Sequence, residues 1–349
     1  MTNFHQLTVS RIQELTPNAV AVTLQIPASL KDTFSFVSGQ YITIKHNGKH
    51  GEVRRAYSIS SAPTAPDITV GIKKVTEGNF SVYANTTLKE GDILEVMPPE
   101  GRFIFEPSNT GRHIAAFAAG SGITPIISIA ESVLTSHLHS TFTLVYGNQN
   151  PEETMFNAEV KALSDKYTNR FFVQNCYSKA QEEGALFGRI DASVTNYIVK
   201  NKFKDTVFDA FYLCGPESMI DTVTATLKNN GVSENKILFE LFTATDAVDT
   251  IAENVAGKTT VEVLVDDASY SFSMDKKTLV LDAVLKEDID APYSCQGGVC
   301  SSCIARVTEG KAEMVKNQIL TDGEIAEGLI LTCQAHPLTD TLKVDYDDV

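Results

Sequence analysis

The stretch Pro292-Tyr293-Ser294-Cys295-Gln296-Gly297-Gly298-Val299-Cys300-Ser301-Ser302-Cys303, with Cys333 farther downstream, decides how this chain is interpreted. Its cysteines follow a C-x4-C-x2-C spacing, and a distant fourth cysteine completes the ligand pattern of a plant-type [2Fe–2S] cluster. Gly297 and Gly298 carry no Cβ, so backbone amides there can approach the cluster sulfides. We therefore expect a one-electron carrier whose cluster ligands are Cys295, Cys300, Cys303 and Cys333.

Two other uses of these cysteines fit the sequence less well. A structural zinc site usually pairs its cysteines in two short knuckles, often with histidine. Here Cys333 stands alone, and His336 follows three residues later without a second histidine beside it. A disulfide framework is typical of small secreted scaffolds, whereas this chain has 349 residues and six cysteines. The iron–sulfur interpretation is favoured over both.

Length and hydrophobicity indicate a multidomain globular protein. A chain of 349 residues with 43% apolar content predicts two or three domains. Residues 1–6 lack the basic segment and apolar run of a secretion signal. The most apolar stretch, 114–130, is interrupted by Gly120, Gly122 and Pro125, which favours a buried strand leading into a helix over a membrane span. We expect a cytoplasmic protein that does not bind a membrane.

Negative charge is concentrated near the C-terminus. Residues 259–349 hold 17 acidic and 7 basic side chains, so they carry −10 of the chain's net −15. An acidic electron-carrier domain favours docking on a basic protein partner and argues against a nucleic-acid ligand. The alternative is that this charge serves solubility alone.

The order of predicted elements divides the chain into three domains. Short alternating strands separated by turns predict an antiparallel β-barrel over 1–108, with strands at Leu7–Val9, Ala19–Gln25, Tyr41–Lys45 and Asp67–Lys73. Strands alternating with helices then predict an α/β parallel-sheet domain over 109–242. Its expected strands are Ile114–Ala118, Thr141–Tyr146, Phe171–Gln174 and Ala210–Cys214, and its expected helices are Pro125–Ser136, Pro151–Lys166 and Glu217–Asn229.

The last part of the chain returns to β structure. A segment rich in Ala, Thr and Asp predicts a linker over 243–258. An α+β domain follows over 259–349, with a hairpin, one helix around Leu279–Lys286 and the cysteine loop.

The parallel domain opens on a glycine turn that is typical of nucleotide binding. Residues 114–125 contain a strand, then Gly120-Ser121-Gly122-Ile123-Thr124-Pro125, a G-x-G-x-x-P sequence. Glycines let the backbone approach a pyrophosphate, and the following helix supplies amides and the positive end of its dipole. Pro125 fits a first helical turn, where its missing N–H is no loss. The alternative is an ordinary strand-to-helix turn.

The barrel contains residues that suit a flavin. In Arg54-Arg55-Ala56-Tyr57-Ser58, an arginine can neutralise phosphate, Tyr57 offers a flat face and Ser58 a hydroxyl donor. Gly78-Asn79-Phe80-Ser81 precedes a predicted short helix, Val82–Thr86, whose first amides can bind phosphate. The alternatives are a surface arginine, a core tyrosine and a helix cap at Ser81.

Together with the domain order, these motifs resemble the ferredoxin–NADP reductase superfamily. R-x-Y-S on a barrel, G-x-G-x-x-P, and Cys214-Gly215-Pro216 after the last predicted parallel strand carry the likeness. The C-terminal cysteine loop makes the chain similar to oxygenase reductases, and most of all to the reductase subunits of phenylacetyl-CoA epoxidase systems of phenylacetate catabolism. The likeness extends over the whole chain, including Phe4-His5, Tyr146-Gly147-Asn148, Gly188-Arg189-Ile190-Asp191, Phe239-Glu240 and Cys333-Gln334-Ala335. It implies FAD, with FMN as the alternative, and a β-grasp ferredoxin-like fold for the last domain.

The resemblance also implies roles for individual residues. Arg55, Ala56, Tyr57 and Ser58 would hold the flavin, with Ser58 near its reactive nitrogen, and Gly78 and Ser81 would bind its pyrophosphate. Gly120, Gly122, Thr124, Cys214, Gly215 and Pro216 would form the nicotinamide-nucleotide site. The residues implied in catalysis are Ser58, Cys214 and Glu240. Cys176 matches no motif and is interpreted as an inert residue after a buried strand.

One position departs from the family. Relatives place arginine just after Tyr-Gly-Asn, where it suits the 2′-phosphate of NADPH, but this chain has Gln149. Ser178 and Lys179, after the next strand, are candidates to compensate. NADPH is the expectation from the family, and NADH is the alternative.

The activity implied by the resemblance is electron delivery to an oxygenase. Electrons would pass from NAD(P)H to the flavin, then singly through the cluster to a partner, a multi-subunit di-iron epoxidase. The alternatives are the reductase component of another mono- or dioxygenase, and a stand-alone NAD(P)H oxidase, against which the cluster argues.

Overall fold

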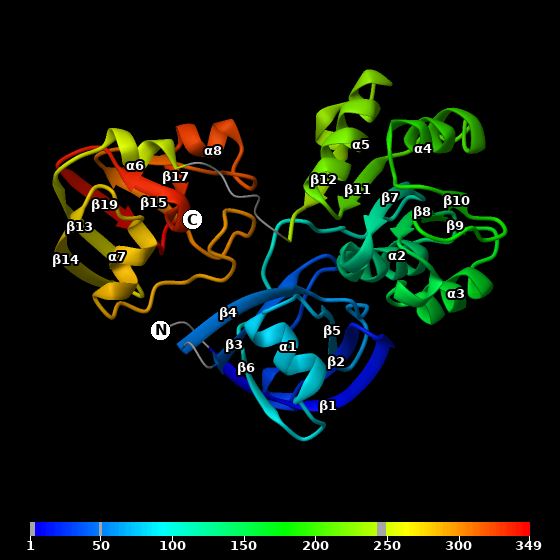
Figure 1. Ribbon diagram of the computed structural model, residues 1–349, viewed down its shortest axis with the longest axis horizontal. Helices are drawn as coiled ribbons and strands as arrows, with labels where there is room; N and C mark the ends of the chain where they lie inside the picture. The colour runs from blue at the N-terminus through cyan, green and yellow to red at the C-terminus, as the bar shows by residue number, and fades with distance from the viewer. Residues whose placement is uncertain (1–3, 49–50, 243–248) are drawn as a thin grey trace. The chain divides into compact units, whose positions relative to one another are not determined.

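The computed structural model of the protein describes residues 4–48, 51–242 and 249–349 (Figure 1). The chain divides into two compact units. One contains residues 5–53 and 57–242, and the other contains Phe4, Arg54–Ala56 and the C-terminal part of the chain. Within the described ranges no helix is both long and apolar enough to cross a membrane.

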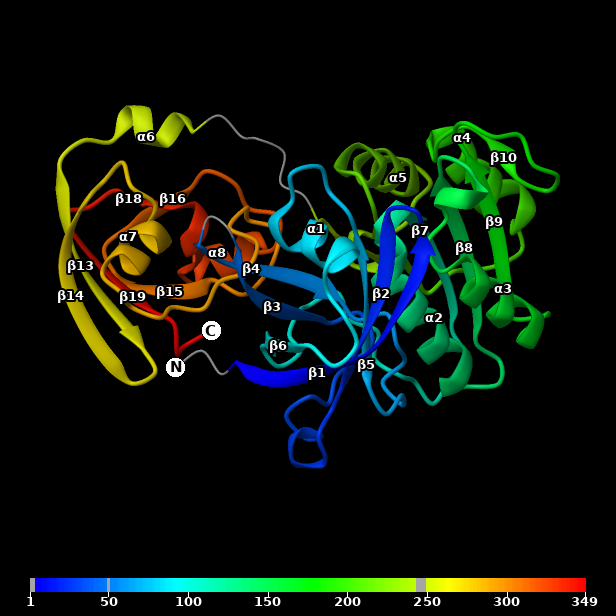
Figure 2. The same ribbon diagram turned by 60° about the horizontal axis from the view of Figure 1, so that its bottom comes forward.

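The N-terminal part of the chain forms a six-stranded antiparallel sheet in the order β4-β3-β6-β1-β2-β5 (Figure 2). An antiparallel bridge between Ile59 and Val70 joins the segment after β4 to the opposite edge strand, so the sheet closes on itself and the predicted β-barrel is confirmed. Its strands are β1 (His5–Thr16), β2 (Ala19–Gln25), β3 (Tyr41–Gly48), β4 (Gly51–Ser58), β5 (Ile68–Lys73) and β6 (Ile93–Val96), and its helix is α1 (Asn79–Thr86).

The middle of the chain forms a six-stranded parallel sheet in the order β10-β9-β8-β7-β11-β12. Figure 1 shows α2 and α3 on one face of this sheet and α4 and α5 on the other. Because both faces are covered, Ile114 to Ala118 are all fully buried. The elements are β7 (His113–Ala119), α2 (Ile123–Ser136), β8 (Thr141–Asn148), α3 (Asn157–Lys166), β9 (Phe171–Tyr177), β10 (Leu186–Phe187), α4 (Ala192–Asn196), β11 (Ala210–Cys214), α5 (Glu217–Asn229) and β12 (Ile237–Glu240).

The strand order of this sheet creates a ligand-binding position. The chain runs outward from β7 to β10 and then returns to β11 on the other side of β7. A 3-10 turn, Gly120–Gly122, follows the carboxyl end of β7, and Gly215 follows that of β11. Open parallel sheets bind ligands in the crevice outside the strand ends where the order reverses. The glycine turn therefore lies where a nucleotide is expected.

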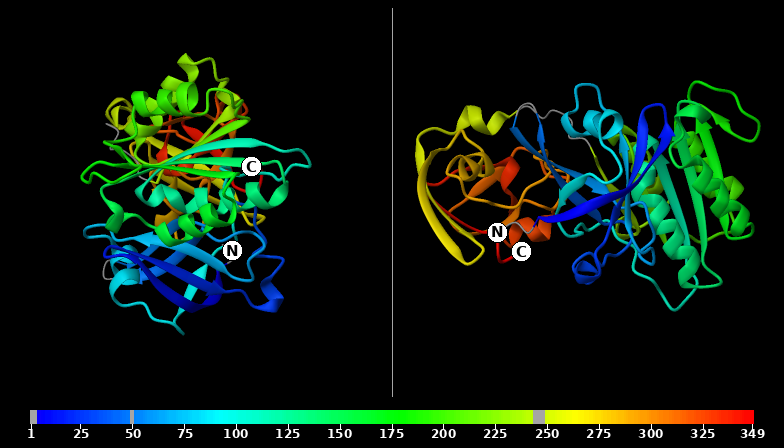
Figure 3. Two further views of the ribbon diagram at one scale, coloured as in Figure 1. Left: turned by 90° about the vertical axis from the view of Figure 1, so that its right-hand side faces the viewer. Right: turned by 90° about the horizontal axis from the view of Figure 1, so that it is seen from below.

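The C-terminal part of the chain forms a mixed five-stranded sheet in the order β14-β13-β19-β15-β17. The β13–β14 hairpin curves past α7 (yellow in Figure 3), whose Val280, Leu281 and Val284 enter the core. This confirms the predicted α+β, β-grasp class. The elements are α6 (Thr250–Asn254), β13 (Lys258–Val265), β14 (Ala268–Asp275), α7 (Val280–Lys286), β15 (Ile304–Glu309), β16 (Ala312–Met314), α8 (Asp322–Ala326), β17 (Leu329–Leu331), β18 (Ala335–Pro337) and β19 (Thr341–Asp345).

Some element boundaries differ from those predicted. The helix expected over 151–166 begins only at Asn157, because Phe156 adopts a left-handed conformation with φ of 55° after a short 3-10 turn. The helix expected at Val82 begins at Asn79. Cys176 lies within β9 and is fully buried. Of the predicted linker, residues 243–248 lie outside the described residues, and Thr250–Asn254 forms helix α6.

Candidate functional site

A buried hydrogen bond joins the barrel to the last strand of the parallel sheet. Ser58, at the end of β4, donates from Oγ to Oε2 of Glu240, at the end of β12, over 2.9 Å. The two residues are 182 positions apart in sequence, and both are buried. Burial raises the pKa of Glu240 to about 8, although the hydrogen bond from Ser58 acts in the opposite direction. This pair therefore holds a proton at neutral pH inside the protein.

Cys214 lies beside this pair. It is paired in register with Glu240 on β12 and with Ala118 on β7, and it is fully buried. Burial, followed by the nearby carboxyl of Glu240, raises the pKa of the Cys214 thiol well above its ordinary value. The structure thus brings together the three residues implied in catalysis, Ser58, Cys214 and Glu240, and keeps the thiol neutral.

The glycines at the switch point are required by close backbone approach. A Cβ on Gly122 would lie 2.1 Å from the carbonyl oxygen of Cys214, so a side chain there would displace one of the two strand ends. Gly120 has φ of 55°, in the left-handed region. A Cβ on Gly215 would meet Ala119 at 3.1 Å and Met219 at 2.7 Å. The predicted glycines therefore form one compact turn at the carboxyl ends of β7 and β11.

Thr124 and Pro216 have structural tasks at this turn. The Thr124 hydroxyl donates to the Ser121 carbonyl over 3.0 Å, and its methyl group lies against Gly71 of the barrel, where a Cβ would approach it to 2.7 Å. Pro216 is the N-cap of α5. Thr124 thus shapes the turn through contacts within the protein.

Sequence reasoning gave no role to Lys73 or Tyr146. A Cβ on Gly120 would lie 3.8 Å from Nζ of Lys73, at the end of β5, so a cation lies beside the nucleotide turn. The fully buried Tyr146 hydroxyl lies 3.2 Å from the carbonyl of Gly120 and 3.0 Å from that of Met155. In the sequence, the pair Lys73-Lys74 at the end of a strand is only a weak indication of a cation beside the glycine turn. Nothing in the sequence indicates that the Tyr146 hydroxyl contacts this turn.

The R-x-Y-S residues are placed by strand alternation on β4. Arg55 is exposed, and its Nη1 donates to the Arg54 carbonyl over 2.7 Å. Ala56 and Tyr57 are half-buried, and the Tyr57 ring lies 5.7 Å from that of Phe80 on α1. A partly exposed aromatic face and an exposed guanidinium fit a flavin ring and its phosphate.

Gly78 and Ser81 differ in detail from the prediction. Gly78, not Ser81, is the N-cap of α1. Ser81 lies one turn inside the helix and is buried, and its Oγ accepts from the Val75 amide over 3.2 Å. A Cβ on Gly78 would lie 2.3 Å from that Oγ. The amides at the start of this eight-residue helix fit a pyrophosphate, whereas the Ser81 side chain closes the preceding turn.

The four predicted cluster ligands lie close together in the cysteine loop and η6 (Thr332–Gln334). Hydrogen bonds from Cys300, Cys333 and the backbone lower the pKa of Cys295, and a hydrogen bond from Cys333 lowers that of Cys303. The thiols of Cys300 and Cys333 have raised pKa values because they donate to these neighbours. Two of the four cysteines thus favour the thiolate form, and their neighbours resist further loss of protons because negative charge would accumulate. The positive charge of a two-iron, two-sulfide core would allow all four to bind as thiolates.

Backbone contacts fix the loop against the fourth cysteine. The Gly297 amide donates to Sγ of Cys295 over 3.3 Å, as expected of an amide that stabilises sulfur charge. Gly298 has φ of 73°, and a Cβ there would lie 3.0 Å from the Lys316 carbonyl. The Cys303 carbonyl accepts from the Thr332 amide at 3.1 Å and its hydroxyl at 2.9 Å, which holds Cys333 beside Cys303.

One unsatisfied group supports the fit of a cluster. Oγ of Ser294, next to Cys295, is buried and has no hydrogen-bond partner among the described residues. A buried hydroxyl without a partner is costly, and cluster sulfur would provide an acceptor.

Gln149, the residue that departs from the family, lies at the carboxyl-terminal edge of the parallel sheet. It is exposed just after β8, and its carbonyl accepts from the Lys179 amide over 2.8 Å. The Asn148 carbonyl accepts from the Ser178 amide over 3.0 Å. Ser178 and Lys179 are therefore adjacent to Gln149, as compensation for a missing arginine requires.

Three family descriptions match successive parts of the chain. An oxidoreductase FAD-binding domain matches residues 6–105, an oxidoreductase NAD-binding domain matches 117–225, and a 2Fe-2S iron-sulfur cluster binding domain matches 263–338. The order of the three is that predicted from the motifs, and the cofactors are FAD, a nicotinamide nucleotide and a [2Fe–2S] cluster.

Similar proteins extend over the whole chain. The chain is 35% identical to a component of the 1,2-phenylacetyl-CoA epoxidase of Escherichia coli (strain K12), with 99% of each chain covered. It is 34% identical to the ferredoxin reductase component of 3-ketosteroid-9-alpha-monooxygenase of Rhodococcus rhodochrous, with 97% of this chain and 96% of that one covered. The fold matches the structure of phthalate dioxygenase reductase with a TM-score of 0.62 at 22% identity, over 98% of both chains.

These whole-length similarities agree with the switch-point turn, the Ser58–Glu240 pair and the cysteine loop. The chain belongs to the flavin- and [2Fe–2S]-containing reductases of the ferredoxin–NADP reductase type, the components of oxygenase systems that pass electrons from NAD(P)H to an oxygenase.

Proposed function

We propose that this reductase serves a di-iron epoxidase acting on an aryl-acyl-CoA thioester. The observation that supports this partner is the 35% identity to a component of a phenylacetyl-CoA epoxidase over 99% of both chains. When bound, the flavin takes two electrons from the nicotinamide nucleotide and the cluster passes them on singly. The protein supplies binding, proton control and exclusion of water.

Proton control is assigned to Glu240 and Ser58. With a pKa of about 8, the buried Glu240 carboxyl is protonated at neutral pH and can hold a proton at Oε2, next to the Ser58 hydroxyl. A neutral carboxylic acid can both donate and accept a hydrogen bond. We assign to this pair the exchange of a proton with the reacting flavin. Cys214 fills the space beside it as a neutral thiol.

Coenzyme binding is assigned to the turn between β7 and α2. Gly120 and Gly122 allow close approach of a pyrophosphate, and the first amides of α2 can donate to it. Lys73 adds a cation beside Gly120. For the adenosine end, Gln149 hydrogen-bonds without charge, and Lys179 beside it is the cation available to a 2′-phosphate. We assign NADPH as donor on this basis, with NADH as the competitor.

Flavin binding is assigned to β4 and α1. Arg55 would pair with the flavin phosphate, Tyr57 would lie against the ring system, and Gly78 would leave the first α1 amides open to pyrophosphate. Cluster binding is assigned to Cys295, Cys300, Cys303 and Cys333, with the Gly297 amide donating to Cys295 sulfur.

The partner is tested by reconstitution. The purified reductase would be combined with the catalytic subunits of a phenylacetyl-CoA epoxidase or with a 3-ketosteroid 9α-monooxygenase oxygenase, each with its own substrate. The proposal predicts substrate-dependent NADPH oxidation coupled to epoxide formation in the first system and little turnover in the second. The second oxygenase is the relevant competitor because its reductase is 34% identical to this chain. Coupled turnover with the steroid system alone would contradict the proposal.

A further inference from the structure

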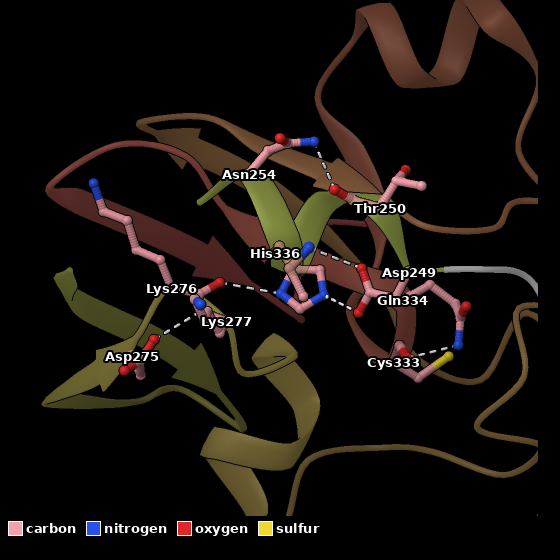
Figure 4. A network of polar contacts seen from close by, with 10 residues as sticks. Asp249, Thr250, Asn254, Asp275, Lys276, Lys277, Cys333, Gln334 and His336 are labelled. Atoms are coloured by element: carbon pink, nitrogen blue, oxygen red, sulfur yellow. Dashed lines mark hydrogen bonds and ion pairs between the residues drawn. The ribbon is translucent and has the colours of Figure 1, made fainter. Parts of the chain in front are cut away.

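His336 lies at the centre of a buried polar network beside the cluster loop (Figure 4). It is on β18, three residues after Cys333, and its side chain is 1% exposed. Its Nδ1 lies 3.1 Å from the carbonyl oxygen of Lys276, and its Nε2 lies 2.9 Å from Oδ2 of Asp249. Neither contact belongs to the cofactor sites described above.

Both partners of the ring are hydrogen-bond acceptors. A neutral imidazole carries one N–H, so one of its nitrogens would turn a lone pair toward a carbonyl or a carboxylate. Turning the ring over by 180° would place the ring carbons Cδ2 and Cε1 near the present positions of Nδ1 and Nε2, so both contacts would be lost. Only the doubly protonated ring donates to both. The geometry therefore requires a cationic His336 if Asp249 is ionised.

Asp249 is held in its ionised form. Its Oδ1 accepts from the Ala252 amide over 2.9 Å, as the N-cap of α6. Burial raises the pKa of Asp249, but the Ala252 amide and His336 more than offset this, so the pKa lies below its ordinary value. Asp249 and His336 consequently form an ion pair at the first turn of α6.

Other charged groups around the ring come from every neighbouring element. Asp282 on α7 has a pKa raised by burial and lowered in part by His336. The Lys276 ammonium pairs with Asp340 over 2.8 Å, which fixes the backbone that accepts from Nδ1. Glu313 is opposite His336 in the register of β16 and β18. The carboxyls of Asp249 and Asp282 interact with the ring and favour a cation at this position.

Helix α6 has little else to hold it. It has five residues, and none of them is buried. Gly257 is fixed farther along by a backbone bond from Lys276 to its carbonyl over 3.0 Å. Among the residues that the structure describes, the ion pair is therefore the strong contact between the start of α6 and β18, the strand that follows Cys333.

We propose that His336 is a charge-dependent anchor, which fastens the segment joining the nucleotide-binding and cluster domains to the cluster domain at Asp249. When anchored, the joining segment spans 242 to 249; when released, it spans 242 to 257, where the Lys276 amide holds the Gly257 carbonyl. At about 3.5 Å per residue, its greatest reach is about 25 Å when anchored and about 53 Å when released. Release therefore lowers the effective concentration of one domain at the other. This consequence rests on the proposed electron path, whereas the anchor itself does not.

The anchor is tested by hydrogen–deuterium exchange of the full-length, cofactor-loaded protein with Asp249→Asn. Asparagine still caps a helix but removes the charge. We expect exchange over residues 250–257 to be about tenfold faster than in wild type. Asp191→Asn is the matched control, because Asp191 caps the five-residue α4 by accepting from Val194 over 2.8 Å without a histidine partner. Its helix should keep wild-type exchange.

The result that overturns the anchor is wild-type protection of 250–257 in Asp249→Asn, or an equal increase at both helices, which would make capping the cause. His336→Gln is the second variant and should reproduce the faster exchange with iron content retained.

Discussion

The Ser58–Glu240 pair stabilises a protonated acid, whereas the cysteine loop stabilises ionised thiols. Ser58 and Glu240 are 182 residues apart in sequence, and burial keeps the Glu240 carboxyl protonated by raising its pKa to about 8. In the loop, three ligands lie within nine residues, and mutual hydrogen bonds lower the pKa of Cys295 and Cys303. The proton on Glu240 is thus retained because distant parts of the chain bury the carboxyl. The cysteine ligands, by contrast, favour thiolates because they lie close together in one short segment and donate hydrogen bonds to each other.

Removing a cluster ligand should affect the cysteine loop and leave the Ser58–Glu240 pair intact. Cys303→Ser should abolish the cluster and reduce electron delivery to a one-electron protein acceptor at least a hundredfold, because the flavin loses its outlet. Flavin reduction by NADPH should persist, because it does not require the cysteine loop. Iron and sulfide content and stopped-flow absorbance measure the two effects. Cys176→Ser, a buried cysteine in β9, is the control and should keep its iron. If Cys303→Ser lost flavin reduction to the same extent as electron delivery, the two regions would not act separately.

The Ser58–Glu240 pair is tested through the protonation of Glu240. Its pKa is raised from 4.5 to about 8, so between these values the folded state keeps a proton that the unfolded state releases. Relative to Glu240→Gln, the wild-type free energy of unfolding should fall by about 1.4 kcal/mol per pH unit in this window, on the order of 5 kcal/mol in total. Below pH 4.5 and above about pH 8, the difference in unfolding free energy between the two proteins should not change with pH.

Urea unfolding of both proteins from pH 4 to 9 measures this difference. Glu234→Gln, which changes a side chain that is 81% exposed, provides the flat reference. If the Glu240→Gln difference were equally flat, Glu240 would be an ordinary ionised carboxylate.

Coenzyme choice is tested at Gln149, which follows β8. Gln149→Arg adds a charged, bidentate partner for a 2′-phosphate, which is worth about 1.5–3 kcal/mol. The preference for NADPH over NADH should therefore rise roughly ten- to a hundredfold in kcat/KM. Gln149→Lys is the control, because lysine adds the positive charge without the two parallel N–H donors of arginine, and it should raise the preference for NADPH by a smaller factor. An unchanged ratio in the arginine variant would place the phosphate elsewhere.

The smallest expected effect concerns the support of the glycine turn. Tyr146→Phe removes the hydroxyl that contacts the Gly120 and Met155 carbonyls. At about 0.5–1.5 kcal/mol, the loss should weaken coenzyme binding about three- to tenfold and raise KM more than it lowers kcat. Tyr212→Phe is matched, because that hydroxyl donates to the Ile104 carbonyl over 3.0 Å. Identical shifts in both variants would reduce Tyr146 to a packing role.

The sequence predicted what local patterns determine. Strand β11 and helix α5 have the bounds that periodicity indicated, and the cysteine ligands follow from spacing. The left-handed Phe156 delays α3 for reasons of tertiary packing, which no propensity reveals. Lys73 beside Gly120 depends on how the barrel lies against the turn. Contacts between elements far apart in sequence were thus accessible only through family resemblance, as for Glu240, or not at all.

The electron path from NADPH through the flavin to the cluster can be followed by anaerobic reduction of the cofactor-loaded protein with NADPH and low-temperature EPR. We expect one NADPH per chain to produce the signal of a reduced [2Fe–2S] cluster, up to one spin per chain. Arg55→Ala retains the four cysteines and is predicted to lose flavin, so it should give no signal with NADPH and the full signal with dithionite. A cluster that NADPH reduces equally well without flavin, or one that stays oxidised while the flavin is fully reduced, would contradict the electron path.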